Sequence, residues 1–131
     1  LLDLVAYYNL GNSISLLGVR DDMPLILSSL DVLVSTSVDE AFGLVLIEGL
    51  ACGCPCLSSN NKGVKSIGGG FIRYAETGNI EEFYQGTKFL LSQDINERDL
   101  RGQESASFVG SKYSIEKAAN RYVKLYNSTQ L

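Results

Sequence analysis

The chain has 131 residues, of which 45% are hydrophobic and 20% are charged, and its formal net charge is −4. This composition is typical of one globular domain with a real core and excludes a disordered chain. An acidic chain without a cluster of Lys and Arg also lacks the surface that nucleic acid binds, so we expect no nucleic-acid partner.

Helices and strands are predicted to alternate through the first 75 residues. The predicted strands are short apolar runs without period-2 alternation, which is the pattern of strands buried on both faces. Asp21 or Asp22 can cap the second helix, and Gly53-Cys54-Pro55 ends the third. The predicted strands are 14–17, 31–37, 55–59 and 71–74, and the predicted helices are 2–10, one around Pro24, and 43–50, with a turn at "NNKG" (60–63).

The second half of the chain is predicted to be helical. Asn79 can cap the helix that follows it, and the terminal helix begins after Ser114. The terminal helix has an apolar stripe at helical spacing, and we expect Tyr113, Tyr122 and Tyr126 to be packing residues. The stripe consists of Ile115, Ala118, Ala119, Tyr122, Val123 and Tyr126.

This order of elements indicates an α/β fold, a Rossmann-like parallel sheet with flanking helices and right-handed crossovers. We expect residues 1–131 to be a single domain that binds a nucleotide-sugar, with 112–131 as its closing C-terminal helix. Four strands are few for a doubly wound sheet, and the first residue is Leu1 rather than Met. We therefore expect that the domain is truncated and that some of the sheet lies upstream.

Cys52, Cys54 and Cys56 form an odd, closely spaced set, which is a poor disulfide framework and fits a reducing compartment. As metal ligands they lack a fourth partner and a zinc spacing, so we expect buried side chains and no metal site. The chain has no histidine, no run long enough to span a membrane and no signal peptide. We expect a cytoplasmic protein, and peripheral membrane contact of the full-length protein stays open.

The segment "DEAFGLVLIEGLACGCP" (39–55) places Glu40 and Glu48 eight residues apart. Glu40 is predicted to lie in the loop before the helix and Glu48 inside it, a spacing that does not favour a shared acid/base pair. The helix start between them offers free N–H groups and a positive dipole end to a phosphate, and Gly43 allows close approach. Each carboxylate can accept hydrogen bonds from the hydroxyls of a sugar. The layout fits a nucleotide-sugar, although two glutamates at this spacing also occur by chance on surface helices.

The segment "EAFGLVLIE" resembles the E-x7-E signature of glycosyltransferase family 4, the group 1 retaining enzymes of the GT-B fold. The likeness extends over "SLLGVRDDMPLILSSLDVLVSTSVDEAFGLVLIEGLACGCPCLSS" and the ending "YSIEKAANRYVKLY". Three departures are evident. Ala41 stands where the family usually has Gly, "KGVKSI" (62–67) replaces a Gly-Gly-(Val)-x-Glu pattern, and the family's basic Arg/Lys pair is expected upstream of the residues present here.

The resemblance implies the C-terminal, donor-binding half of a GT-B enzyme that transfers a sugar from a nucleotide diphosphate sugar with retention. It implies no metal and no cofactor, and an acceptor (a sugar, glycan or lipid-linked molecule) bound by an N-terminal domain, in polysaccharide or glycoconjugate synthesis. The isolated chain is then expected to be inactive. The resemblance assigns Glu40 and Ala41 to the donor sugar, with Glu40 as the catalytic residue, Phe42, Gly43 and Leu44 to the diphosphate, Glu48 to the ribose, and Gly18, Val19 and Arg20 to the base.

Three alternatives stay open at this stage. A nucleotide-sugar epimerase of the same fold would use a similar cleft without a separate acceptor. A noncatalytic domain that binds a nucleotide or a protein would fit the altered residues 62–67. A receiver-like domain is the weakest option, because no acidic pair follows the first predicted strand.

Overall fold

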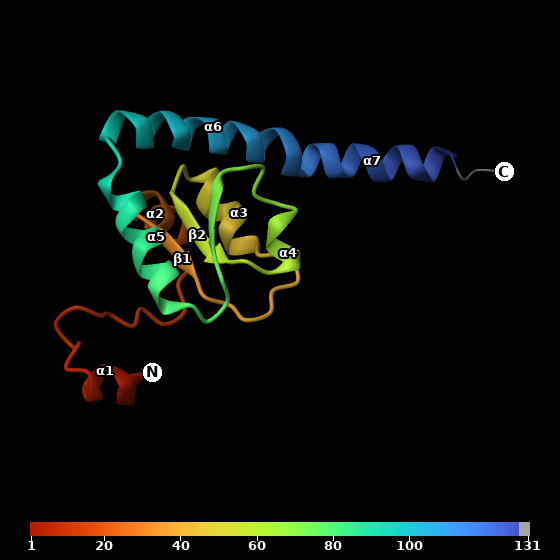
Figure 1. The fold of residues 1–131 in the computed structure, drawn as a ribbon. Helices are drawn as coiled ribbons and strands as arrows, with labels where there is room; N and C mark the ends of the chain where they lie inside the picture. The colour runs from red at the N-terminus through yellow and green to blue at the C-terminus, as the bar shows by residue number, and fades with distance from the viewer. Residues whose placement is uncertain (129–131) are drawn as a thin grey trace.

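A parallel three-stranded sheet forms the centre of the fold in the computed structural model, which describes residues 1–128 (Figure 1). The strand order is β1-β2-β3, with Leu33 opposite Cys56 and Cys56 opposite Ile72. The elements are α1 (Leu2–Tyr7), α2 (Met23–Ser29), β1 (Leu33–Ser35), α3 (Leu44–Ala51), β2 (Cys56–Ser59), α4 (Lys62–Lys65), β3 (Ile72–Ala75), α5 (Ile80–Ser92), α6 (Ile95–Tyr113) and α7 (Ile115–Ser128).

Both faces of the sheet are covered, as the continuous apolar strands predicted. Successive side chains of a strand point to opposite faces, so Cys56 and Leu57 enter different core clusters. The larger cluster packs α3, α4 and α6 on one face, and the smaller packs α5 on the other. The larger contains Leu46, Ile47, Leu50, Cys56, Val64, Ile67, Ile72 and Val109, and the smaller contains Leu57, Ala75 and Leu90.

The α/β class, the parallel sheet and three of the four predicted strands are confirmed. The predicted strand at 14–17 is wrong: that segment is coil, and Ile14, Leu16 and Leu17 are exposed. A strand requires a hydrogen-bonding neighbour, and the ladders of the described residues join only β1 to β2 and β2 to β3. The apolar composition of segment 14–17 led us to predict a buried strand, but composition cannot show whether a neighbouring strand is present to receive its hydrogen bonds.

The "NNKG" segment is not a simple turn, because it runs into the short helix α4. Asn61 caps that helix, since its side-chain Oδ1 accepts a hydrogen bond from the Val64 N–H at 3.2 Å. Asn79 caps α5 in the same way through the Glu82 N–H, as predicted. Asp22 is the N-cap residue of α2, but its carboxylate binds the Arg20 guanidinium instead of the helix backbone.

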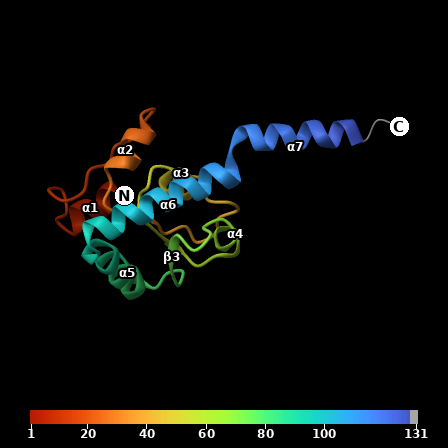
Figure 2. The same ribbon diagram turned by 90° about the horizontal axis from the view of Figure 1, so that it is seen from above.

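Helix α6 crosses α3 at the end of the sheet where the strands begin, and α7 extends away from the body (Figures 1 and 2). Tyr113 packs as predicted, with its ring against Phe42 and Phe108. Tyr122 and Tyr126, which we also predicted to be packing residues, are 62% and 67% exposed within residues 1–128, so the body of the fold does not bury them. The structure starts the closing helix at Ile115 rather than 112, since residues 112 and 113 belong to α6; residues 129–131 of the predicted range lie outside the described residues.

The three cysteines are free thiols that pack the turn between α3 and β2. Cys54 and Cys56 are buried and Cys52 is partly buried. Burial raises the pKa of the Cys54 thiol and raises that of Cys56 to about 12. Their expected role as packing residues agrees with this burial. None of the helices within residues 1–128 combines the length and hydrophobicity needed to cross a bilayer.

Candidate functional site

The loop formed by residues 36–43 leaves the carboxyl end of β1 and leads into α3. At its end the Glu40 side chain turns back onto the chain. Its Oε1 atom accepts hydrogen bonds from the Phe42 N–H at 3.3 Å and the Gly43 N–H at 3.1 Å. The first hydrogen bonds of α3 are donated by Leu46 and Ile47 to the Gly43 carbonyl. Two backbone donors at the helix start thus converge on one anionic oxygen.

Gly43 adopts the left-handed conformation, with φ +79°, as the N-cap residue of α3. A Cβ atom built on it would lie 3.3 Å from Ile67 Cδ1 and 3.3 Å from Leu46 Cδ1, so it would point into the core. The sequence predicted a glycine here so that an anion can approach the backbone. The structure adds a second reason for glycine, because the turn needs a positive φ and the core has little space for a side chain, and the approach of an anion stays a prediction.

Glu48 lies inside α3 and its side chain is exposed, whereas Leu46, Ile47, Gly49 and Leu50 around it are buried. The helix therefore has an open side on which this carboxylate stands. Glu40 precedes the helix and Glu48 follows its first turn, as the sequence predicted. A hydrogen bond between the two carboxylates is not among the contacts within residues 1–128, so the structure places one before α3 and the other within it without pairing them.

Within residues 1–128 no hydrogen bond or ion pair joins the segment Gly18-Val19-Arg20 to this site. Val19 is fully exposed, and the ion pair of Arg20 within those residues is with Asp22. Asp22 raises the pKa of the Arg20 guanidinium, and Arg20 lowers the pKa of the Asp22 carboxyl. The sequence placed 18–22 after a strand, but that strand is coil here, so the sheet does not position this segment. The assignment of these three residues to a base stays a prediction.

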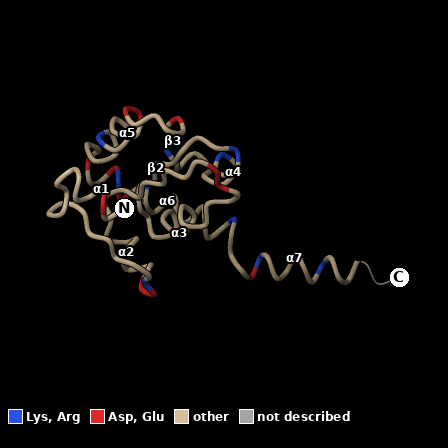
Figure 3. The backbone as a smooth tube through the Cα atoms, turned by 90° about the horizontal axis from the view of Figure 1, so that it is seen from below, with Lys and Arg blue, Asp and Glu red and all other residues tan. Residues whose placement is uncertain are grey.

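Helix α4 lies directly beside loop 36–43, which the sequence did not predict. In Figure 3 the acidic part of the loop runs next to the basic residues of α4. Gly63 of α4 is in contact with the backbone of Glu40 and Ala41. The signal for the helix was present, since Asn61 precedes it as a capping residue, but no sequence pattern reports the contact.

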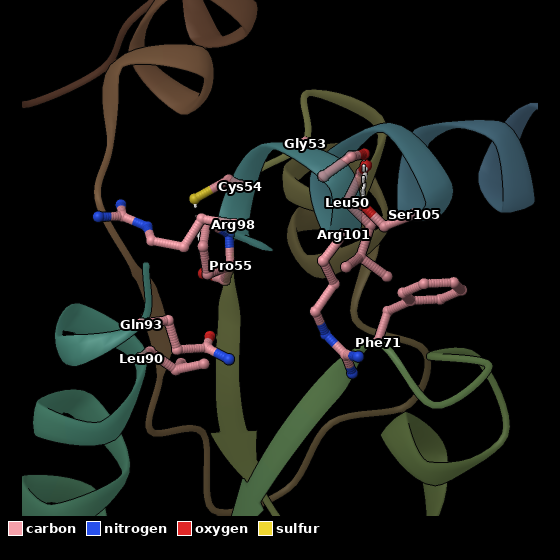
Figure 4. Close-up of a pocket in the computed structure, with 11 residues that line it drawn as sticks. Leu50, Gly53, Cys54, Pro55, Phe71, Leu90, Gln93, Arg98, Arg101 and Ser105 are labelled. Atoms are coloured by element: carbon pink, nitrogen blue, oxygen red, sulfur yellow. Dashed lines mark hydrogen bonds between the residues drawn. The ribbon is translucent and has the colours of Figure 1, made fainter. Parts of the chain in front are cut away.

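A separate small pocket lies at the opposite end of the sheet (Figure 4). It is lined by Pro55 and Phe71, which precede β2 and β3, and by Arg98 and Arg101 of α6. Arg98 binds Asp31, and Arg101 donates to the Gly70 carbonyl. In a parallel sheet all strands begin at the same edge, so this pocket is remote from loop 36–43. No group of His, Cys, Asp or Glu within residues 1–128 is arranged to hold a metal ion.

Residues 1–106 match the sequence profile of a family described as "Glycosyl transferases group 1". A curated relative, the N-acetyl-alpha-D-glucosaminyl L-malate synthase of Bacillus anthracis, is 27% identical in an alignment of 132 positions that covers 96% of this chain and 33% of the relative. The chain spans a third or less of the length of the curated relatives it matches.

Two solved structures have the same fold. The sucrose-phosphate synthase of Thermosynechococcus elongatus is 26% identical with a TM-score of 0.88, over 97% of this chain and 33% of that one. The Anabaena protein Alr3699/HepE in complex with UDP is 17% identical with a TM-score of 0.85, over 97% of this chain and 35% of that one.

Proposed function

This chain belongs to the Glycosyl transferases group 1 family, and we propose that it is the donor-binding part of a retaining glycosyltransferase. Its α/β fold is that of the GT-B glycosyltransferases. The donor is a nucleotide diphosphate sugar, and the nucleoside diphosphate is UDP. The UDP complex of a protein with the same fold supports this choice of nucleotide.

The observation that carries the proposal is the convergence of the Phe42 and Gly43 N–H groups on one carboxylate oxygen. The same donors, with Leu44 at the start of the helix, suit an oxygen of the donor diphosphate, which resembles a carboxylate oxygen in charge and size. Glu40, displaced from these donors, then accepts hydrogen bonds from the sugar, with Ala41 beside it. The exposed Glu48 carboxylate accepts hydrogen bonds from the ribose hydroxyls.

In the proposed reaction the bond between the anomeric carbon and the diphosphate oxygen breaks, and a bond to an acceptor oxygen forms on the same face. The acceptor hydroxyl gives its proton to the oxygen of the departing diphosphate that held the sugar, and the helix start stabilises this diphosphate. Glu40 is the proposed catalytic residue because its carboxylate is next to the sugar. The acceptor is a sugar, glycan or lipid-linked molecule bound outside this chain, in polysaccharide or glycoconjugate synthesis. We place the protein in the cytoplasm, in peripheral contact with the membrane.

The test uses the full-length protein that carries this chain. Titration with UDP is expected to saturate, and Glu48→Ala is expected to weaken binding by about 10- to 100-fold, because hydrogen bonds to a charged group are worth about 1.5–3 kcal/mol. Glu104→Ala, an exposed glutamate of α6, is the matched control and leaves binding unchanged.

Turnover is then measured with a panel of UDP-sugars, and the anomeric configuration of the product is read by NMR. Retention in a product that contains the acceptor supports the proposal. Conversion of one UDP-sugar into another without an acceptor would identify an epimerase instead. UDP binding that is absent, or indifferent to Glu48, rejects the proposed site.

A further inference from the structure

Gly63 has no room for a side chain. A Cβ atom built on it would lie 2.0 Å from the Glu40 carbonyl oxygen and 2.7 Å from the Ala41 carbonyl oxygen. Both atoms belong to the backbone, which cannot rotate away as the end of a flexible side chain can. Gly63 lies within α4 and is not among the glycines with positive φ, so its backbone conformation is open to alanine. The need for glycine at this position therefore comes from the contact and not from the dihedral angles.

Helix α4 is held firmly on its other sides. The Tyr74 hydroxyl donates to the Val64 carbonyl of α4 at 3.2 Å, and the Tyr113 hydroxyl donates at 3.1 Å to the carbonyl of Ile67, two residues after α4. Val64 and Ile67 are both fully buried in the larger core cluster. Strand β3 and the end of α6 thus fix α4, so a clash at Gly63 is relieved more easily by movement of the loop than by movement of α4.

The segment of α4 and the residues just after it contact Gly43 through side chains, whereas Gly63 contacts the loop backbone. The atoms that face Gly43 are the side-chain ends of Ile67 and Val64, at 3.3 and 3.5 Å from the position of a Cβ. Such ends adjust by rotation. A displacement of the loop at Glu40 and Ala41 is therefore expected to reach the backbone donors of the helix start only weakly.

We propose that Gly63 is a positioning residue for the donor sugar: its missing side chain sets the Glu40–Ala41 backbone against α4. This inference rests on the proposed function. The 2.0 Å separation is at least 1 Å shorter than a Cβ tolerates, so alanine displaces the Glu40 backbone by about that amount. A misplacement of 1 Å costs on the order of 100-fold in rate.

The experiment compares Gly63→Ala with Gly110→Ala in the full-length protein. Gly110 also lies in a helix, and a Cβ there meets nothing within 4 Å, so its variant is the matched control. We expect Gly63→Ala to lower kcat for sugar transfer about 100-fold while the Kd for UDP changes less than about threefold. Gly110→Ala should leave both quantities unchanged. A merely structural role would lower the thermal unfolding temperature and UDP affinity together with kcat.

An unchanged kcat in a folded Gly63→Ala protein overturns the inference, as does a UDP affinity that falls in parallel with kcat. Where Gly63→Ala fails to fold, Tyr113→Phe is the test, because it keeps the ring and removes the hydrogen bond to the Ile67 carbonyl, which anchors the chain two residues after α4. A several-fold lower kcat at unchanged UDP affinity then supports positioning by α4, and an unchanged kcat overturns it. Failure of the wild-type protein to bind UDP rejects the proposed function itself, which keeps the two failures distinct.

Discussion

Removal of the Glu40 side chain is expected to strengthen the binding of UDP and to abolish sugar transfer. In the structure the Glu40 carboxylate accepts hydrogen bonds from the Phe42 and Gly43 N–H groups, and we assign these two donors to the diphosphate. UDP must displace this carboxylate before a phosphate oxygen can take its place. Glu40→Ala removes the competitor and the sugar contact at once, so the two readouts move in opposite directions.

The magnitude follows from the two hydrogen bonds. They share one acceptor atom, have lengths of 3.3 and 3.1 Å and involve a partly exposed carboxylate, so together they are worth about 1 kcal/mol. That free energy corresponds to about a fivefold lower Kd for UDP in Glu40→Ala. Glu40→Gln keeps the acceptor oxygen and loses only the charge, so its Kd should lie between those of Glu40→Ala and the wild type.

Calorimetric titration with UDP gives the Kd, and turnover with UDP-sugars gives kcat. Asp39→Ala is the control, since it removes a neighbouring exposed charge that is not hydrogen-bonded to the Phe42 or Gly43 N–H in the described residues. A Kd for UDP that rises more than about threefold in Glu40→Ala would refute the competition. If the Kd for UDP decreases equally in Asp39→Ala, the stronger binding comes from the loss of a negative charge near the site and not from the freed N–H groups.

Three further outcomes are expected. Gly102→Ala places a Cβ 2.7 Å from the Gly53 carbonyl oxygen and should lower the free energy of unfolding by about 1–3 kcal/mol, measured by urea denaturation, whereas Gly110→Ala is neutral or slightly stabilising. Burial raises the pKa of Cys56 from its ordinary value of 9.0 to about 12, so the folded state holds a proton that the unfolded state releases. The protonated Cys56 thiol therefore makes its full contribution to the free energy of unfolding below pH 9.0, and this contribution falls by about 1.4 kcal/mol per pH unit as the pH rises towards 12. A Cys56→Ala protein should lack this slope. Iodoacetamide at neutral pH should alkylate Cys52 in the native state and leave Cys56 unmodified until denaturant is added, as mass spectrometry would detect; modification of Cys56 at the native rate of Cys52 would contradict its burial.

The sequence was sufficient for elements whose signals are local. The apolar segments 31–37 and 55–59 predicted strands because a buried parallel strand is a short continuous apolar run, and Asn79 marked the start of α5. Segment 14–17 has the same apolar composition and was predicted wrongly. Hydrophobicity reports a tendency to be buried, whereas a strand also needs a neighbour to receive its hydrogen bonds.

For the candidate site too, one part could be predicted from the sequence and another part depends on the structure. The spacing of Glu40 and Glu48 about the start of α3 was readable from the sequence, because the positions of residues along a helix follow from its fixed geometry. The hydrogen bonds from Phe42 and Gly43 to the Glu40 carboxylate depend on the turn that Gly43 makes at φ +79°.

The sequence by itself determined the α/β class, the helix that follows Glu40 and contains Glu48, and the family resemblance, since all three depend on local order and periodicity. Only the tertiary structure decided that α4 supports the loop, that Gly63 must lack a side chain and that α7 leaves the body. Contacts between segments more than twenty residues apart depend on how the crossovers stack against the sheet. No local pattern encodes that a Cβ atom on Gly63 would lie only 2.0 Å from the Glu40 carbonyl oxygen.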